Sequence, residues 1–273
     1  YKAAKAAGIK PIIGCEVYMA RRKMTDRVHG LDNDPYHLVL LCENQKGYEN
    51  LCYLVSEAFL HGFYGKPRVD LELLEGHHEG LIALSACLAG AIPQALMNEN
   101  YDEAKRMALE LSRIFGPEHF YLEMQDHGID KQRPVNQGLQ RLARETGLPL
   151  VVTNDAHYLR REDADMQDVL LCIQTGKTVD DLNRMRFETQ EFYLKSEQEL
   201  RQLFPGCGEA FDNTVKIAQM CNVDFTFHEY HLPAYPVPEG YTNEGYFRML
   251  CEKGFQERYP DAPQEYRERM EYE

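Results

Sequence analysis

Residues 149–158 read PLVVTNDAHY, and the interpretation of the whole chain starts from this stretch. A short apolar run is followed at once by polar side chains, among them Asp155 and His157. In α/β barrels and open α/β sheets, functional groups gather at the carboxyl ends of strands because the loops there converge on one face. The stretch therefore predicts a buried strand that ends at a functional site.

The chain on either side of this stretch alternates between short apolar runs and longer helical patterns. The runs that predict further strands are residues 9–17 (IKPIIGCEV), 37–42 (HLVLLC), 80–85 (GLIALS) and 120–124 (FYLEM). Apolar positions with a helical period predict helices over residues 47–60, 102–115 and 134–146. Continuous apolar strands that alternate with helices indicate a mostly parallel sheet covered by helices. The fold class is therefore α/β, either a barrel or a doubly wound sheet, and we favour the barrel.

The pattern changes near residue 195. Residues 196–199 (SEQE) predict the start of a helix, and residues 207–222 predict another. Residues 230–241 (YHLPAYPVPEGY) hold three prolines and predict an extended linker. We expect one domain over residues 1–226, and a linker with the beginning of a second domain over residues 227–273.

Both ends of the sequence have helical character. Residues 1–7 (YKAAKAA) predict the end of a helix that Gly8 stops, and residues 264–273 predict a charged helix. We therefore expect the chain to be part of a larger protein.

Composition excludes several classes of protein. The longest apolar runs fall well short of the roughly 18–20 residues that a membrane-spanning helix needs. None of the eight cysteines forms a CxxC pair, which argues against a disulfide framework and a zinc knuckle and indicates reduced thiols in the cytoplasm. Neither GxGxxG nor GxxxxGK[ST] follows a predicted strand. The 30 basic and 44 acidic residues give a formal charge of −14, so a domain that grips nucleic acid by itself is not indicated.

Asp155 and His157 stand two residues apart, a spacing that points both side chains the same way in an extended segment. A carboxylate and an imidazole on one side of a strand end make half of a metal site. A turn or helix cap beside a surface histidine would explain the same spacing, and the spacing alone favours that simpler interpretation.

Three more residues of metal-ligand type lie beside other predicted strands. Glu16 ends one run, His37 opens the next, and Cys87 follows the third. Each alone is explained as a surface carboxylate, a hydrogen-bonded histidine or a small buried residue. Together, five such residues beside four strands predict a metal site. A mixed set of nitrogen, oxygen and sulfur ligands suits Zn²⁺ or Mn²⁺ better than Ca²⁺, and carboxylates that can bridge suggest two-metal phosphoryl hydrolysis.

A family resemblance joins these observations. The chain resembles the PHP (polymerase and histidinol phosphatase) domain of bacterial replicative, C-family DNA polymerase III alpha subunits. The motifs that carry the resemblance are, in order, GIKPIIGCEVY, HLVLLCEN with GYENL, LIALSACLAG, FYLEMQDHG, LVVTNDAHYL, VLLCIQTGKT, RMRFETQEFYLKS and LPAYPVPEGY. It implies a distorted (β/α)₇ barrel whose mouth can hold up to three metal ions through nine ligands.

The resemblance also implies a ligand set and domain limits. Glu16, His37, Cys87, Asp155 and His157 match five of the nine ligands, and the other four, an HxH pair, an Asp and the His of a TDHG motif, are expected upstream of Tyr1. The barrel would then lack its first βα units here. The aspartates that bind Mg²⁺ in the polymerase palm are expected downstream of Glu273. Residues 126–128 (DHG) are not among the nine and are interpreted as a turn.

The function implied is that of a DNA-directed DNA polymerase, a nucleotidyltransferase of bacterial chromosome replication. Its PHP barrel would be a metal-dependent 3′–5′ exonuclease for proofreading, with Asp155 and His157 in catalytic roles, and the chain alone is expected to be inactive. The alternative is an inert scaffold that supports the polymerase or docks a proofreading subunit. A free-standing phosphoesterase is disfavoured by the proline-rich linker. The expected partners are primer–template DNA, bound through the whole polymerase, and replisome subunits such as the sliding clamp, with no membrane involved.

Overall fold

The structure is a computed structural model that describes residues 1–230 and 232–273. The chain divides into two compact units, Tyr1–Asp224 and Phe225–Glu273, and each is described by itself. The predicted linker over residues 230–241 contains His231, which lies outside the described residues.

The first unit is built on a six-stranded sheet with the order β3-β1-β2-β4-β5-β6. The strands are β1 (Gly14–Met19), β2 (Tyr36–Cys42), β3 (Arg68–Val69), β4 (Leu81–Leu84), β5 (Phe120–Met124) and β6 (Leu150–Val152). The mixed α/β class is confirmed. Within the described residues β3 and β6, the outer strands, do not pair, so the sheet is open.

One strand departs from the predicted parallel arrangement. β2 runs antiparallel to both of its neighbours, β1 and β4, whereas the remaining neighbours in the sheet are parallel. The reason lies in the connection, since no helix separates β1 from β2. Parallel neighbours need a crossover that is usually helical, whereas a chain that returns directly pairs antiparallel.

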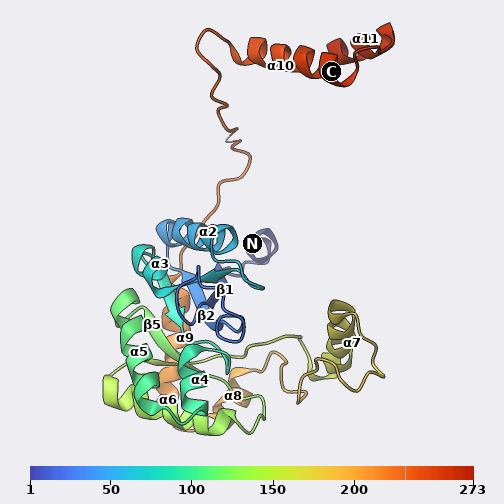
Figure 1. The fold of residues 1–273 in the computed structure, drawn as a ribbon. Coiled ribbons are helices and arrows are strands. Elements are labelled where there is room, and N and C mark those ends of the chain that lie inside the picture. The colour runs from blue at the N-terminus through green and yellow to red at the C-terminus, as the bar shows by residue number, and fades with distance from the viewer. Residues whose placement is uncertain (231) are drawn as a thin grey trace. The chain divides into compact units, whose positions relative to one another are not determined.

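The helices around this sheet are α1 (Lys2–Ala6), α2 (Gln45–Leu60), α3 (Leu71–Gly76), α4 (Ala91–Met97), α5 (Tyr101–Phe115), α6 (Gln132–Thr146), α8 (Glu197–Leu203) and α9 (Gly208–Met220) (Figure 1). The 3₁₀ turn η1 (Arg161–Asp163) leads into α7 (Ala164–Thr175), which stands away from the sheet on extended loops (Figure 1). The predicted helices correspond to α2, α5, α6, α8 and α9. The short α3 and α4 have too few turns to show a clear apolar period.

The core beneath the later strands lies between the sheet and α9. Ile217 of α9 and Cys221, which follows it, pack against side chains from the three neighbouring strands β4, β5 and β6. The strand residues of this cluster are Ile82, Leu84, Tyr121 and Val151. Since residues two apart on a strand share a face, this core identifies the inward face of the sheet.

The second unit contains α10 (Asn243–Arg258) and α11 (Gln264–Tyr272). Thr242 caps α10, because its hydroxyl accepts a hydrogen bond from the Gly245 amide at 3.1 Å. An ion pair between Arg248 and Glu271, with 2.6 Å between nitrogen and oxygen, links the two helices. The two helices of this unit are therefore linked by an ion pair as well as by the short connection between them.

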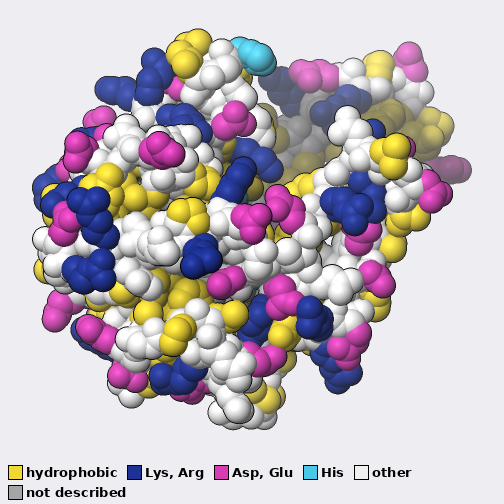
Figure 2. All heavy atoms as spheres, turned by 90° about the horizontal axis from the view of Figure 1, so that it is seen from below, with side chains coloured by type: hydrophobic (Ala, Val, Ile, Leu, Met, Phe, Trp, Pro, Cys, Tyr) yellow, Lys and Arg dark blue, Asp and Glu magenta, His cyan; other side chains and the backbone are white. Residues whose placement is uncertain are grey.

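The surface carries both signs of charge. On the face shown in Figure 2, Lys and Arg side chains are interspersed with Asp and Glu side chains. Among the residues that the structure describes, no helix combines the length and the apolar character needed to cross a bilayer.

A buried arginine fixes the loop between β1 and β2. Arg68 in β3 is fully buried, and its guanidinium donates to four backbone carbonyls. These are the carbonyls of Gly62 at 3.0 Å, Asp32 at 2.9 Å, Met24 at 2.8 Å and Asp26 at 2.8 Å. The hydrogen bonds satisfy backbone groups that the irregular loop would otherwise leave unpaired.

We expect Arg68→Met to lower the free energy of unfolding by about 3 kcal/mol, because buried carbonyls lose their donors. Urea denaturation followed by circular dichroism measures the effect. The matched control is Arg106→Met, which removes an exposed, solvent-screened ion pair with Glu103 and should change stability by about 0.5 kcal/mol or less. Equal effects of the two substitutions would contradict the role of Arg68.

Candidate metal centre

The register of β1 against β2 brings Glu16 and His37 together. Glu16 pairs with Val39, and Tyr18 pairs with His37, two steps apart along the antiparallel ladder. Directly opposite residues share a face of the sheet, and so do residues two apart on one strand. Glu16 and His37 therefore lie diagonally across the two strands on one face, and His37 Nδ1 is 3.0 Å from Glu16 Oε1.

Cys87 reaches the same place from the end of β4. Ala86 has a left-handed backbone with φ of 63°, which turns the chain sharply out of the strand. The turn closes where the Gly90 amide donates to the Cys87 carbonyl at 2.9 Å. A Cβ at Gly90 would stand 2.1 Å from the Ser85 carbonyl oxygen, so the turn requires glycine there. Cys87 Sγ then lies 3.6 Å from His37 Nδ1.

The donor atoms of Glu16, His37 and Cys87 all lie within 4.8 Å of one another. They are a carboxylate oxygen, an imidazole nitrogen and a thiol sulfur from three different strands or strand ends. Zn²⁺ binds all three kinds of donor, and carboxylate and imidazole also suit Mn²⁺. By chemical type and by proximity, this donor set fits a divalent cation.

The three side chains also change one another's proton affinity. The Cys87 sulfur and the Glu16 carboxylate both face His37 Nδ1, and together they raise the pKa of His37 from 6.5 to about 10. The hydrogen bond from His37 lowers the pKa of Glu16. The metal-free cluster is therefore an ion pair in which a proton on His37 supplies the positive charge.

Asp155 and His157 lie on the loop after β6 and are not part of the three-residue cluster. Asp155 has a left-handed backbone with φ of 43°. His157 Nδ1 is 2.8 Å from the Asp155 carbonyl oxygen, which assigns the donor role to Nδ1–H and leaves Nε2 as the free ring nitrogen. The imidazole packs edge-on against Phe187 and Phe192, with ring centroids 4.8 Å and 5.4 Å away.

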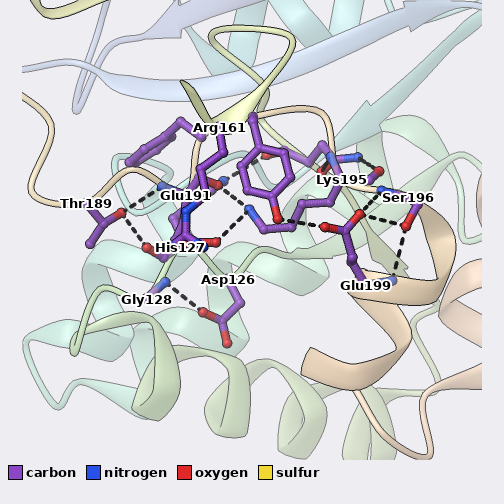
Figure 3. Close-up of polar contacts among 12 residues, drawn as sticks. Asp126, His127, Gly128, Arg161, Thr189, Glu191, Lys195, Ser196 and Glu199 are labelled. Atoms are coloured by element: carbon purple, nitrogen blue, oxygen red, sulfur yellow. Dashed lines mark hydrogen bonds and ion pairs between the residues drawn. The ribbon is translucent and has the colours of Figure 1, made fainter. Parts of the chain in front are cut away.

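A segment distant in sequence holds this loop in place. The Asn154 amide makes two hydrogen bonds with the Lys195 backbone, at 3.0 Å and 3.1 Å. Lys195 is buried, its ammonium donates to the Glu191 carbonyl, and Arg161 pairs with the Glu191 carboxylate at 2.6 Å (Figure 3). The sequence analysis missed these roles, because residues 41 positions apart show no local signal that they will meet.

His127 also helps to hold the loop after β6 in place. It is buried and stacks on Phe192, with 4.1 Å between ring centroids. Both ring nitrogens are engaged, one with the Asn154 carbonyl oxygen at 2.8 Å and the other with the Gln132 side chain at 2.8 Å. Burial lowers the pKa of His127. A neutral imidazole with both nitrogens occupied has no nitrogen left to bind a metal. The predicted turn over residues 126–128 forms beside it, where the Gly128 amide donates to the Asp126 carboxylate (Figure 3).

Comparisons with known proteins relate this arrangement to a family. Residues 1–127 match the PHP domain. The chain is also similar to proteins named DNA polymerase III subunit alpha. It is 47% identical to that of Thermus aquaticus over 96% of this chain and 22% of the relative. It is 46% identical to that of Treponema pallidum and 44% identical to that of Borreliella burgdorferi, over 100% of this chain and 23% and 24% of those relatives. The chain therefore spans less than a quarter of the length of these proteins.

The raised pKa of His37 has a consequence that can be measured. A group whose folded-state pKa is raised contributes stability that is fully present below its unfolded value and is lost as the pH rises through the folded value. The contribution of His37 should therefore be present at pH 6.5 and disappear towards pH 10 in the metal-free protein. NMR titration of the His37 ring should show the raised midpoint, and Cys87→Ala should lower it. Cys207→Ala, which removes a thiol that contacts Gln140, is the control and should leave the midpoint unchanged.

Proposed function

Since residues 1–127 match the PHP domain and the whole chain is similar to one segment of bacterial DNA polymerase III alpha subunits, we propose that the chain forms part of such a replicative polymerase. We further propose that its PHP site hydrolyses the 3′ end of a DNA strand, as a proofreading 3′–5′ exonuclease. The observation that carries the second proposal is the cluster of Glu16, His37 and Cys87, whose donor atoms lie within 4.8 Å of one another.

Five side chains would hold the metal. Glu16, His37 and Cys87 offer donors that are already close together, and Asp155 and His157 would complete the set from the neighbouring loop. A bound Zn²⁺ or Mn²⁺ supplies a Lewis acid that activates water and stabilises the leaving oxygen of a phosphodiester. Up to three such ions are proposed for the intact domain.

The protein itself orients the His157 ring on the loop after β6. The hydrogen bond from His157 Nδ1–H to the Asp155 carbonyl fixes the ring and presents Nε2 as a ligand or proton acceptor. Phe187 and Phe192 pack edge-on against the ring and restrict it further, while the residue stays exposed to solvent. His157 thus needs little reorganisation to act, which favours a catalytic role for it beside Asp155.

The proposal extends to domains and partners. Residues 1–226 would be the PHP domain, and residues 227–273 a linker and the start of the polymerase palm, whose Mg²⁺-binding aspartates we place outside this chain. Primer–template DNA and replisome subunits such as the sliding clamp are the partners proposed for the whole polymerase, in the cytoplasm. A chain with a net charge of −14 would leave the electrostatic grip on DNA to the rest of that polymerase.

A second candidate function is an inert scaffold for the polymerase. One observation favours it. Asp155 and His157 stand apart from the cluster of the other three residues, and His37 is held as the charged partner of Glu16. An arrangement of this kind is also compatible with a barrel that keeps its shape and has no catalytic metal.

The decisive experiment follows the loss of 3′-terminal nucleotides by the full-length polymerase with Mn²⁺ or Zn²⁺. Asp155→Asn should lower the exonuclease rate by at least about a hundredfold, the scale on which loss of a charge-stabilising group slows catalysis. The matched control is Asp126→Asn, which alters a carboxylate on the neighbouring loop that accepts the Gly128 amide and should leave the rate within about twofold. Wild-type rates in Asp155→Asn would exclude the nuclease and favour the scaffold.

A further inference from the structure

A carboxylate lies buried beneath the candidate metal centre. Glu123 is in β5, the strand between β4 and β6, and is 5% exposed. It pairs with Val151 and lies two residues beyond Tyr121, both members of the core cluster on the inward face. A carboxylate in such a place is costly unless hydrogen bonds compensate for the lost water, so its contacts have to be accounted for.

The hydrogen bonds of Glu123 reach both neighbouring strands. Oε2 accepts the backbone N–H of Ala86 at 2.9 Å. Oε1 accepts the hydroxyl of Thr153 at 2.5 Å and the side-chain amide of Gln125 at 3.1 Å. The Glu123 backbone N–H in turn donates to the Ser85 hydroxyl at 2.8 Å. One side chain thus joins the end of β4 to the end of β6.

These two strand ends carry ligand candidates from different parts of the sequence. Cys87 is the next residue after Ala86, and Asp155 lies two residues after Thr153. Ala86 and Asp155 also have left-handed backbones, with φ of 63° and 43°. Non-glycine residues stay in that region only where the surrounding structure holds them there. The hydrogen bond from Ala86 to Glu123 is such a restraint.

We propose that Glu123 is a positioning residue of the metal centre: its carboxylate holds the turns that carry Cys87 and Asp155 so that both side chains face one metal site. The inference rests on the metal site proposed above. Because Glu123 is buried and both of its oxygens already accept hydrogen bonds from the protein, we assign it a positioning role and not a ligand role. Partners of this kind behind the ligands change metal affinity about tenfold to a hundredfold when they are removed.

The test uses Co²⁺ as the probe, in full-length protein first stripped of metal. A thiolate bound to Co²⁺ gives a near-ultraviolet charge-transfer absorption, so the band reports on Cys87 and should be absent in Cys87→Ser. We expect Glu123→Gln to weaken Co²⁺ binding about tenfold to a hundredfold and to reduce the band at saturating Co²⁺. Glutamine keeps the size of the side chain and replaces one of the two accepting oxygens by a donor.

Two further variants separate positioning from general loss of stability. Thr153→Val replaces a hydroxyl that donates to Glu123 and accepts from Gln125 by a methyl group, leaves Glu123 itself in place, and should weaken Co²⁺ binding several-fold. Asp32→Asn changes a buried carboxylate that accepts from Arg22 and the Val28 amide, away from all five ligand candidates. It should lower the melting temperature and leave the Co²⁺ affinity and the band unchanged.

The outcomes are distinct. Wild-type Co²⁺ affinity and absorption in Glu123→Gln would overturn the positioning role of Glu123 without contradicting the metal site. If Glu123→Gln does not fold, wild-type affinity and absorption in Thr153→Val would overturn the positioning role in the same way. Equal weakening in Asp32→Asn would also overturn it, since the effect would then be general. A wild-type protein without the thiolate band would overturn the proposed site and the inference together.

Discussion

The reversed direction of β2 is the constraint on which the candidate site depends. Strands that run parallel bring their carboxyl ends to one edge of a sheet, and a histidine at the start of such a strand would lie at the opposite edge. Because β2 is antiparallel to β1 and β4, its first residues lie beside the ends of both neighbours. His37 therefore meets Glu16, which lies within β1, and Cys87, which follows β4, although His37 lies at the start of its own strand.

Much of the fold could be predicted because apolar runs mark buried strands directly. Residues 120–124 and 37–42 were predicted within one residue of β5 and β2. The direction of β2 could not be predicted, since an apolar run has the same composition in either direction. β3 has two residues and no run at all. It exists because Arg68 and Val69 find partners on β1, which is a tertiary effect.

The candidate site was predictable only in part, and for a physical reason. Glu16, His37 and Cys87 each adjoin a strand that the sequence reveals, so their convergence follows from sheet geometry. The support behind Asp155 and His157 comes from Lys195 and Phe192, whose contacts form between segments that local patterns do not connect. Glu123 did leave a signal, a single charge inside FYLEM. A charge within a buried strand implies partners that satisfy it.

The electrostatics of the cluster bear directly on the proposed metal binding. The Cys87 sulfur and the Glu16 carboxylate both face His37 Nδ1 and raise its pKa to about 10, so the metal-free cluster holds a proton there. Burial raises the pKa of Glu123, which opposes the ionisation of that carboxyl. A metal ion needs the lone pair of an unprotonated imidazole, so its binding must displace the proton on His37. The groups that would bind a divalent cation thus also hold the proton that competes with it, and metal affinity at the proposed site should increase with pH until His37 no longer carries a proton.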